Sequence, residues 1–187
     1  MRYPSSNKIY HKPISHANRG MNLEALINET NKYYIENNLV YITKKPTPIG
    51  IVSVSDDEKK MITKAFFKEP STLDYSGVYK GRYIEFDAKE TNSTTSFPIS
   101  NILGHQIDYI KKLINHQAIV FLIIKIKNEF YVIDGKYLIN YINTSSKKSI
   151  PYKTIIKNGY KIDSDGLIKV NYLPIIDKLI GGLHEKV

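Results

Sequence analysis

One short segment restricts the fold of this chain more than any other. From Ala118 to Ile126 the sequence is almost continuously apolar, and no charged side chain occurs between Ala118 and Ile124. That run is far too short to cross a membrane, which takes about 20 residues in a helix. A strand that is apolar at nearly every position is typical of a sheet buried on both faces. We therefore predict a buried strand over Ala118–Ile126.

Helical and extended patterns alternate along the rest of the chain. Apolar residues recur at helical spacing in two segments, at about 23–37 and 99–116. Further strands are predicted at about 39–43, 49–54, 61–67, 75–79, 82–89 and 129–133. An order of helix, strands, helix and strands predicts an α/β fold with a mixed arrangement of elements.

Two pairs of these strands are close enough in sequence to form hairpins. Lys80-Gly81 separates one pair, and a two-residue loop of this kind is typical of a tight hairpin. The second pair flanks the charged connector 55–60, and we expect it to protrude as a stalk over about 44–68. Residues 1–21 are rich in Pro, Ser and Asn, which predicts a flexible basic arm.

The charge balance favours a polyanionic partner. The chain carries 27 Lys plus Arg against 18 Asp plus Glu, a formal net charge of +9. Two basic stretches contain no acidic residue, namely the segment before Glu24 and Gly135–Ile162. Such stretches suit nucleic acid, because neutralised phosphates release condensed counterions. The alternative interpretation is a solvated, lysine-rich surface.

Composition excludes several other classes of protein. The 187 residues form a chain of ordinary domain size, so we assign residues 1–187 to a single domain. There is no cysteine, which excludes a disulfide scaffold, a Cys-ligated zinc site and a cysteine nucleophile. No apolar signal segment is visible near Met1, and we expect a cytoplasmic protein without a membrane partner.

The residues that predict chemistry lie on the second hairpin. Asp87 and Lys89 are two apart on a predicted strand and so share a face, and Asp74 opens the strand with which it pairs. Two carboxylates that converge in this way repel each other unless a cation lies between them. A hard divalent ion such as Mg²⁺ takes oxygen ligands and activates a bound water for phosphodiester hydrolysis. The alternative is a surface strand on which Glu85, Asp87 and Lys89 are merely solvated.

The spacing of Asp74 and Asp87-Ala88-Lys89 resembles the PD-(D/E)xK nuclease signature. More specifically, nearly the whole chain resembles the RecU family of Holliday junction resolvases. The matching segments are Asn18–Glu24, Asn28–Tyr34, Lys44–Pro48, Asp74–Tyr75, Tyr79–Ile84, Ala88–Thr91, Thr95–Pro98 and His105–Gln106.

This resemblance implies a restriction-endonuclease-like core, with a mixed central β-sheet flanked by helices and the predicted stalk entering the junction. The family's metal ligands fall on Thr72, Asp74, Asp87 and Gln106, with Mg²⁺ as the cofactor and Mn²⁺ as a substitute. The transition-state-stabilising lysine falls on Lys89. Phosphate contacts are expected at Arg19, Lys44, Lys45, Lys80 and Arg82.

The chain departs from the family at one position of the metal site. Asp87 stands where the family commonly has Glu, so the carboxylate is one methylene shorter. Glu85 lies on the same face and Glu24 in a matched segment, and both are auxiliary candidates. For Arg19, the alternative to a phosphate contact is an ion pair with Glu24 or Glu29 that fixes the arm.

The activity implied by the resemblance is symmetric, Mg²⁺-dependent nicking of four-way DNA junctions during recombination and repair. Two symmetric cuts need two sites, which implies a homodimer, and a RecA-type recombinase is a further possible partner. Two other interpretations remain open. One is a non-catalytic, junction-binding or recombinase-modulating protein on the same fold, and the other is a sequence-specific endonuclease.

Overall fold

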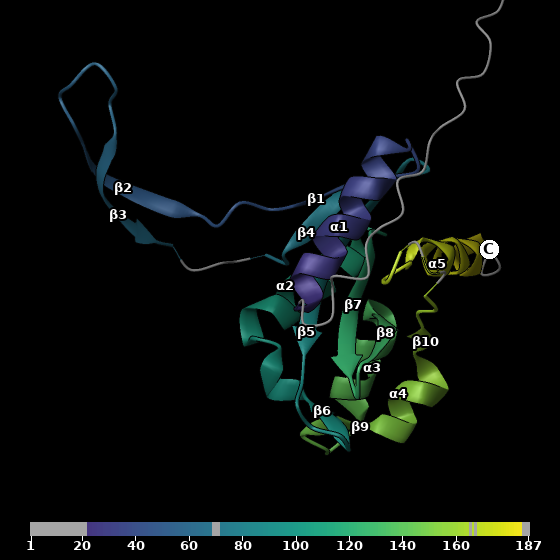
Figure 1. Ribbon diagram of the computed structural model, residues 1–187. Coiled ribbons are helices and arrows are strands. Elements are labelled where there is room, and N and C mark those ends of the chain that lie inside the picture. The colour runs from purple at the N-terminus through teal and green to yellow at the C-terminus, as the bar shows by residue number, and fades with distance from the viewer. Residues whose placement is uncertain (1–21, 69–71, 165, 167, 185–187) are drawn as a thin grey trace, which may run out of the picture.

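The computed structural model of this chain describes residues 22–68, 72–164, 166 and 168–184. Its centre is a sheet of six strands in the order β1-β4-β5-β7-β8-β10 (Figure 1). The strands are β1 (Tyr41–Lys44), β4 (Tyr75–Tyr79), β5 (Arg82–Glu90), β7 (Ile119–Ile126), β8 (Glu129–Asp134) and β10 (Tyr160–Lys161). All neighbours pair antiparallel except β5 and β7, which are parallel. The predicted mixed sheet is therefore confirmed.

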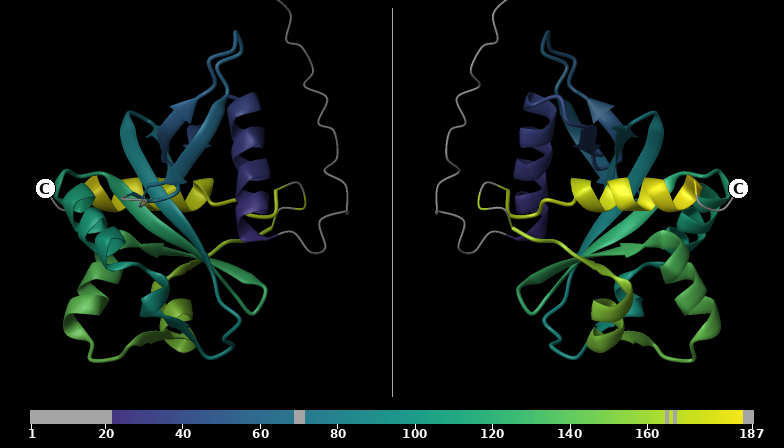
Figure 2. Two further views of the ribbon diagram at one scale, coloured as in Figure 1. Left: turned by 90° about the vertical axis from the view of Figure 1, so that its left-hand side faces the viewer. Right: turned by 90° about the vertical axis from the view of Figure 1, so that its right-hand side faces the viewer.

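Helices cover both faces of the sheet, and each face has its own apolar cluster. On one face lie α1 (Leu23–Glu36) and α5 (Leu173–His184), which pack against β5 and β7 through residues such as Phe86 and Phe121 (Figure 2). On the other face lie α2 (Gly104–Asn115), α3 (Gly135–Thr144) and α4 (Tyr152–Asn158). The buried strand predicted at Ala118–Ile126 is confirmed as β7, and its apolar side chains alternate between the two clusters.

The tight hairpin predicted around Lys80-Gly81 is also confirmed. Lys80 and Gly81 have φ of 49° and 73°, so both central residues of the turn are left-handed. This is the backbone of a two-residue turn whose twist matches that of the flanking strands. The turn fixes the register of β4 against β5, beginning with the pair Tyr79 and Arg82.

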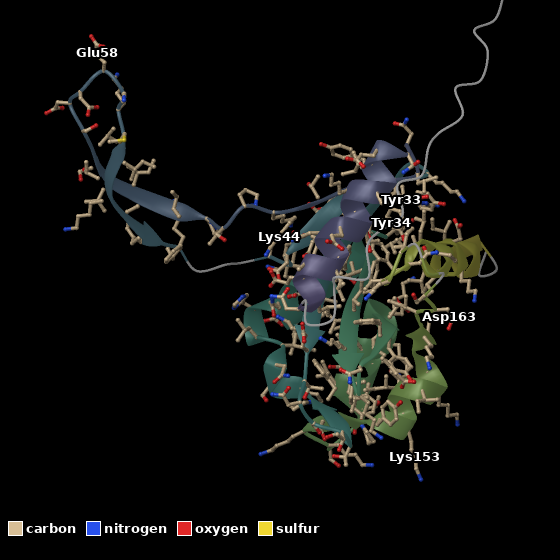
Figure 3. All side chains as sticks on the ribbon, viewed as in Figure 1. Tyr33, Tyr34, Lys44, Glu58, Lys153 and Asp163 are labelled. Carbon is tan, nitrogen blue, oxygen red and sulfur yellow. The ribbon has the colours of Figure 1, made fainter. Side chains whose placement is uncertain are left out.

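The stalk predicted over about 44–68 is a second, separate hairpin. It consists of β2 (Ile49–Val54) and β3 (Ile62–Phe67), which pair only with each other. Figure 1 shows this hairpin extending away from the central sheet, and Glu58 marks its tip in Figure 3. Every residue of β3 is exposed, and Gly50, the buried residue of β2, lies against Phe66 of the same hairpin.

The long helix predicted at 99–116 is wrong in its first part. Ile99–Asn101 form a 3₁₀ turn, Ile102 and Leu103 are extended, and α2 begins only at Gly104. Ile102 is buried in the core, which fixes this segment in extended form although its apolar residues continue the helical spacing. The sequence patterns also did not predict β6 (Ser96–Pro98), β9 (Ser149–Pro151), α3, α4 and β10 as separate elements.

None of the helices in the described part of the chain is both long and apolar enough to cross a membrane.

Candidate active site

The register of the β4–β5 hairpin brings the two predicted catalytic aspartates together. Tyr75 pairs with Phe86, and the same register continued by one residue places Asp74 opposite Asp87, close enough for Asp74 to raise the pKa of Asp87. The edge strand continues the same row, because the Lys45 amide donates to the Asp74 carbonyl oxygen over 2.7 Å. The row therefore runs across three strands, with Asp74 in the middle.

The structure rejects the interpretation of β5 as a solvated surface strand. Asp87 and Glu85 are both 0% exposed, because this face of β5 lies beneath α2. A buried carboxylate must be hydrogen-bonded, paired or neutralised, since removing it from water is otherwise very costly. The polar groups around Asp87 therefore have a specific role.

One oxygen of Asp87 is well supplied with donors and the other has none. Its Oδ2 accepts a hydrogen bond of 2.6 Å from Gln106 Nε2 and lies 3.1 Å from Lys89 Nζ. Its Oδ1 is buried and has no hydrogen-bond partner among the described residues. Burial raises the pKa of Asp87 to about 6, Lys89 opposes that rise, and Asp74 adds to it. Asp87 thus has one oxygen with two donors and one buried oxygen without a donor.

Gln106 owes its orientation to the start of α2. Its Oε1 accepts from the Leu103 amide over 3.2 Å and so satisfies a free amide at the helix N-terminus. The amide nitrogen then faces Asp87. In this arrangement Gln106 orients Asp87, and the ligand role predicted for it requires the amide to turn over, since only the oxygen can bind a cation.

The remaining groups fit a Mg²⁺ ion. The described residues contain no cluster of three or more His, Cys, Asp or Glu side chains, so the donors would be Asp74, Asp87 and neutral oxygens. Mg²⁺ is usually bound through one or two carboxylates while it keeps several waters. A cation bound at the partnerless Oδ1 of Asp87 would also offset the repulsion between Asp87 and Asp74. Thr72, two residues before Asp74, is half-buried at the same strand end and remains a predicted ligand.

Glu85 was predicted as an auxiliary metal ligand, a role that requires a free carboxylate oxygen. The structure gives it a different environment. Its Oε1 accepts from Lys45 Nζ and the Leu73 amide, and its Oε2 accepts from the hydroxyls of Tyr83 and Tyr109. Four donors fill the lone-pair positions of a carboxylate. Burial and contact with Glu85 raise the pKa of Tyr109 to about 12, so this hydroxyl stays a donor at neutral pH. In this arrangement Glu85 is not a metal ligand.

Several residues predicted to contact DNA are paired within the protein. Lys44 forms an ion pair with Glu24, the second auxiliary candidate, and Lys45 forms one with Glu85. Lys80 pairs with Asp177 of α5 over 2.6 Å. Lys80 lies in the turn and Arg82 directly follows it, at the other end of the hairpin from Asp74. Their contacts with phosphate remain predictions, and Arg19 lies outside the described residues.

Comparison with known proteins agrees with this geometry. A family model described as "Recombination protein U", RecU, matches residues 18–178. The chain belongs to the RecU family. Proteins named Holliday junction resolvase RecU from Bacillus thuringiensis (strain Al Hakam), Bacillus cereus (strain AH820) and Bacillus anthracis are each 41% identical to it over 186 residues. Each alignment covers 94% of this chain and 93% of the relative.

The RecU match includes both hairpins and every predicted metal-site residue. Sequence reasoning missed two contributors to the site, Tyr109 and the side chain of Lys45 in its contact with Glu85. Tyr109 follows Gln106 by three residues, which places both on one face of a helix. That spacing was the available signal for Tyr109.

Proposed function

We propose that this chain is a Mg²⁺-dependent Holliday junction resolvase that nicks opposing strands of a four-way DNA junction. The observation that carries the proposal is the pairing of Asp74 with a fully buried Asp87 whose Oδ1 has no partner in the described structure. Relatives that bear the name Holliday junction resolvase support the choice of substrate. The formal net charge of +9 suits a DNA partner.

In this proposal the chain's residues have separate tasks. Asp74 and Asp87 hold Mg²⁺, with Thr72 as a further ligand. When bound, the ion supplies a more acidic water and a charge against a phosphate oxygen. Lys89, whose ammonium lies 3.1 Å from Asp87 Oδ2, orients the attacking water and offsets charge as the bond to the leaving 3′ oxygen breaks. Gln106 keeps the Asp87 carboxylate in place through its 2.6 Å hydrogen bond.

The exposed hairpin supports a homodimer. Its large apolar side chains are unusually open to solvent, with exposed fractions of 56% for Ile51, Val52 and Phe66 and 80% for Phe67. Exposed apolar patches on soluble proteins mark interaction sites, and an isolated two-stranded hairpin is barely stable in water. A second copy that covers this surface would supply the second active site for symmetric nicking. A recombinase partner and a cytoplasmic location remain predictions.

Cleavage of a synthetic four-way junction, beside linear duplex of the same sequence, tests the proposal. We expect paired symmetric nicks in the junction with Mg²⁺ or Mn²⁺, little cutting of the duplex, and none of either with EDTA. Junction binding without nicks in both metals would identify a non-catalytic binding protein. Cutting of the duplex at one fixed sequence would identify a sequence-specific endonuclease.

A further inference from the structure

Both limbs of the stalk leave the central sheet beside the metal-binding strand. The outgoing limb starts at Lys45, directly after β1, and the returning limb ends at Leu73, directly before Asp74. The backbone hydrogen bond from Lys45 to Asp74 joins the two limbs at their base. Lys44, labelled in Figure 3, lies where the hairpin departs from the body beside α1. The root of the stalk therefore lies directly beside the row formed by Lys45, Asp74 and Asp87.

One buried carboxylate oxygen receives donors from both limbs. Glu85 Oε1 accepts from Lys45 Nζ of the outgoing limb and, over 3.3 Å, from the Leu73 amide of the returning limb. The side chain of Glu85 is 0% exposed and that of Lys45 is 24% exposed. Breaking such a pair leaves an uncompensated buried charge, so the contact holds its geometry firmly.

The other oxygen of Glu85 ties the same point to the helix above the site. Glu85 Oε2 accepts from Tyr109 of α2 over 3.1 Å and from Tyr83 of β5 over 2.6 Å. Tyr109 lies one helical turn after Gln106, which contacts Asp87. Glu85 thus connects the stalk root, the catalytic strand and the helix that orients Asp87.

We propose that Glu85 is a positioning residue that holds Lys45 and Leu73, and with them the root of the stalk, in a fixed place relative to Asp74 and Asp87. This inference rests on the proposed function, because the position of the stalk matters only if the stalk engages the DNA being cut. A junction held by the stalk then places the phosphate to be cleaved at one fixed position relative to the metal site.

The same contact keeps a positive charge away from the metal site. Lys45 lies in the row that contains Asp74 and Asp87, so its ammonium competes with a divalent ion for those carboxylates if it is released. Its pairing with Glu85, two residues along β5 from Asp87, holds the charge aside. Loss of Glu85 therefore releases this charge, and loss of either partner loosens the stalk root, so both should slow the chemistry. In this proposal Lys45 acts through Glu85 and not as the phosphate contact that the sequence predicted.

A double-mutant cycle tests this proposal. The variants are Glu85→Gln, Lys45→Met and the two together, with Lys161→Met as the control because Lys161 pairs with Glu129 over 2.6 Å on the far edge strand β10. Single-turnover cleavage and junction affinity are measured in parallel. Hydrogen exchange at the Leu73 amide is followed in the protein alone, so this measurement does not depend on any activity.

We expect each single variant to cleave about tenfold more slowly at unchanged junction affinity, as is typical when a supporting partner is lost. The double variant should also be slower by about tenfold, not by the about hundredfold of independent sites. Exchange at the Leu73 amide should accelerate in all three variants and not in Lys161→Met. Lys45→Arg, which keeps the charge, should restore most of the rate.

Three results would overturn the proposal. Weaker junction binding in Lys45→Met, with Glu85→Gln unaffected, would make Lys45 a direct DNA contact. Multiplicative losses in the double variant would make the two residues independent. Unchanged exchange at Leu73 would show that Glu85 does not hold the stalk root. A wild-type protein that cuts no junction overturns the proposed function instead, while the exchange data still decide whether Glu85 fixes the root.

Discussion

The two hairpins of this protein follow each other in the chain and differ in almost everything but topology. The β4–β5 hairpin lies inside the six-stranded sheet, and four consecutive residues of β5, from Ile84 to Asp87, are buried. The β2–β3 hairpin forms its own two-stranded sheet, and Gly50 is its only buried strand residue. Both are antiparallel pairs, but β4–β5 turns through the left-handed residues Lys80 and Gly81, whereas β2–β3 is joined by the longer connector 55–61, in which Lys60 has a φ of 44°.

The difference shows what each setting allows. Burial gives β4–β5 a low-dielectric environment, in which Asp87 has a raised pKa and every polar contact is strong. Exposure gives β2–β3 reach and a free apolar surface, at the expense of stability of its own. Changes in β4–β5 should therefore alter chemistry or the stability of the fold, whereas changes in β2–β3 should alter association.

The largest effect is expected from the buried hairpin. Asp74→Asn removes a carboxylate from the metal site, and with it several kcal/mol of transition-state stabilisation, so junction cleavage should fall by about 10³-fold or more. Junction binding should persist, because the proposed function makes Asp74 a metal ligand and not a phosphate contact. Cleavage and gel-shift assays on one preparation measure both quantities. Equal losses of binding and cleavage would contradict this separation of tasks.

The second effect concerns the exposed hairpin. Phe67→Asp places a charge on a side chain that is 80% exposed in the single chain. If a second copy covers this surface, the dissociation constant of the dimer should rise by about tenfold or more. Analytical ultracentrifugation measures it. The control is Ile156→Asp on α4, a residue that is 52% exposed outside the stalk and should leave association unchanged.

The third prediction uses the buried charge of Asp87. Burial keeps the pKa of Asp87 at about 6 in the folded protein, above its ordinary value of 3.8, so ionised Asp87 destabilises the folded state above pH 6. That destabilisation fades as the pH falls toward 4. Asp87→Asn should therefore raise the free energy of unfolding by about 1–3 kcal/mol at pH 8 without metal, and by little at pH 4.

Urea unfolding at the two pH values measures this difference. Asp108→Asn is the control, because Asp108 lies in α2 with a side chain that is 69% exposed and should change stability little at either pH. A loss of stability in Asp87→Asn at pH 8 would mean that the ion pair with Lys89 outweighs the cost of burial.

The smallest expected effect is on the free energy of unfolding, and it differs between the connections of the two hairpins. Gly81→Ala introduces a side chain at a φ of 73°, where its Cβ would meet no other atom within 4 Å, so only backbone strain is added. We expect a loss of about 1 kcal/mol in the free energy of unfolding. Lys60→Gly relieves a φ of 44° at the tip of the stalk and should leave global unfolding unchanged. A change in the free energy of unfolding for Lys60→Gly as large as that for Gly81→Ala would show that the two hairpins unfold as one unit.

The core of the site could be predicted because it is local. Once Lys80-Gly81 is recognised as a two-residue turn, counting outward along both strands pairs Asp74 with Asp87. The alternation along β5 likewise placed Glu85, Asp87 and Lys89 on one face. Loop length and strand period therefore determine this part of the site without any tertiary information.

The environment of these residues could not be predicted in the same way. Lys45 and Tyr109 reach Glu85 across 40 and 24 residues of sequence, and no local pattern specifies such contacts. Alternating charges on β5 suggested solvent, whereas the packing of α2 buries Glu85 and Asp87. The break before α2 was missed because Ile102 keeps the apolar spacing of a helix while it is extended in the core.

The parallel pairing of β5 with β7 has a consequence for synthesis on the ribosome. Asp74, Asp87 and Lys89 emerge before α2 and β7, so a nascent chain first holds these side chains in water. Parallel pairing must await the crossover that contains α2, and contacts of this long-range kind form slowly. Until β7 docks, Gln106 has no fixed place above Asp87 and the carboxylates stay hydrated. A chain that stalls before Ile119 therefore carries the predicted catalytic residues in an incomplete fold.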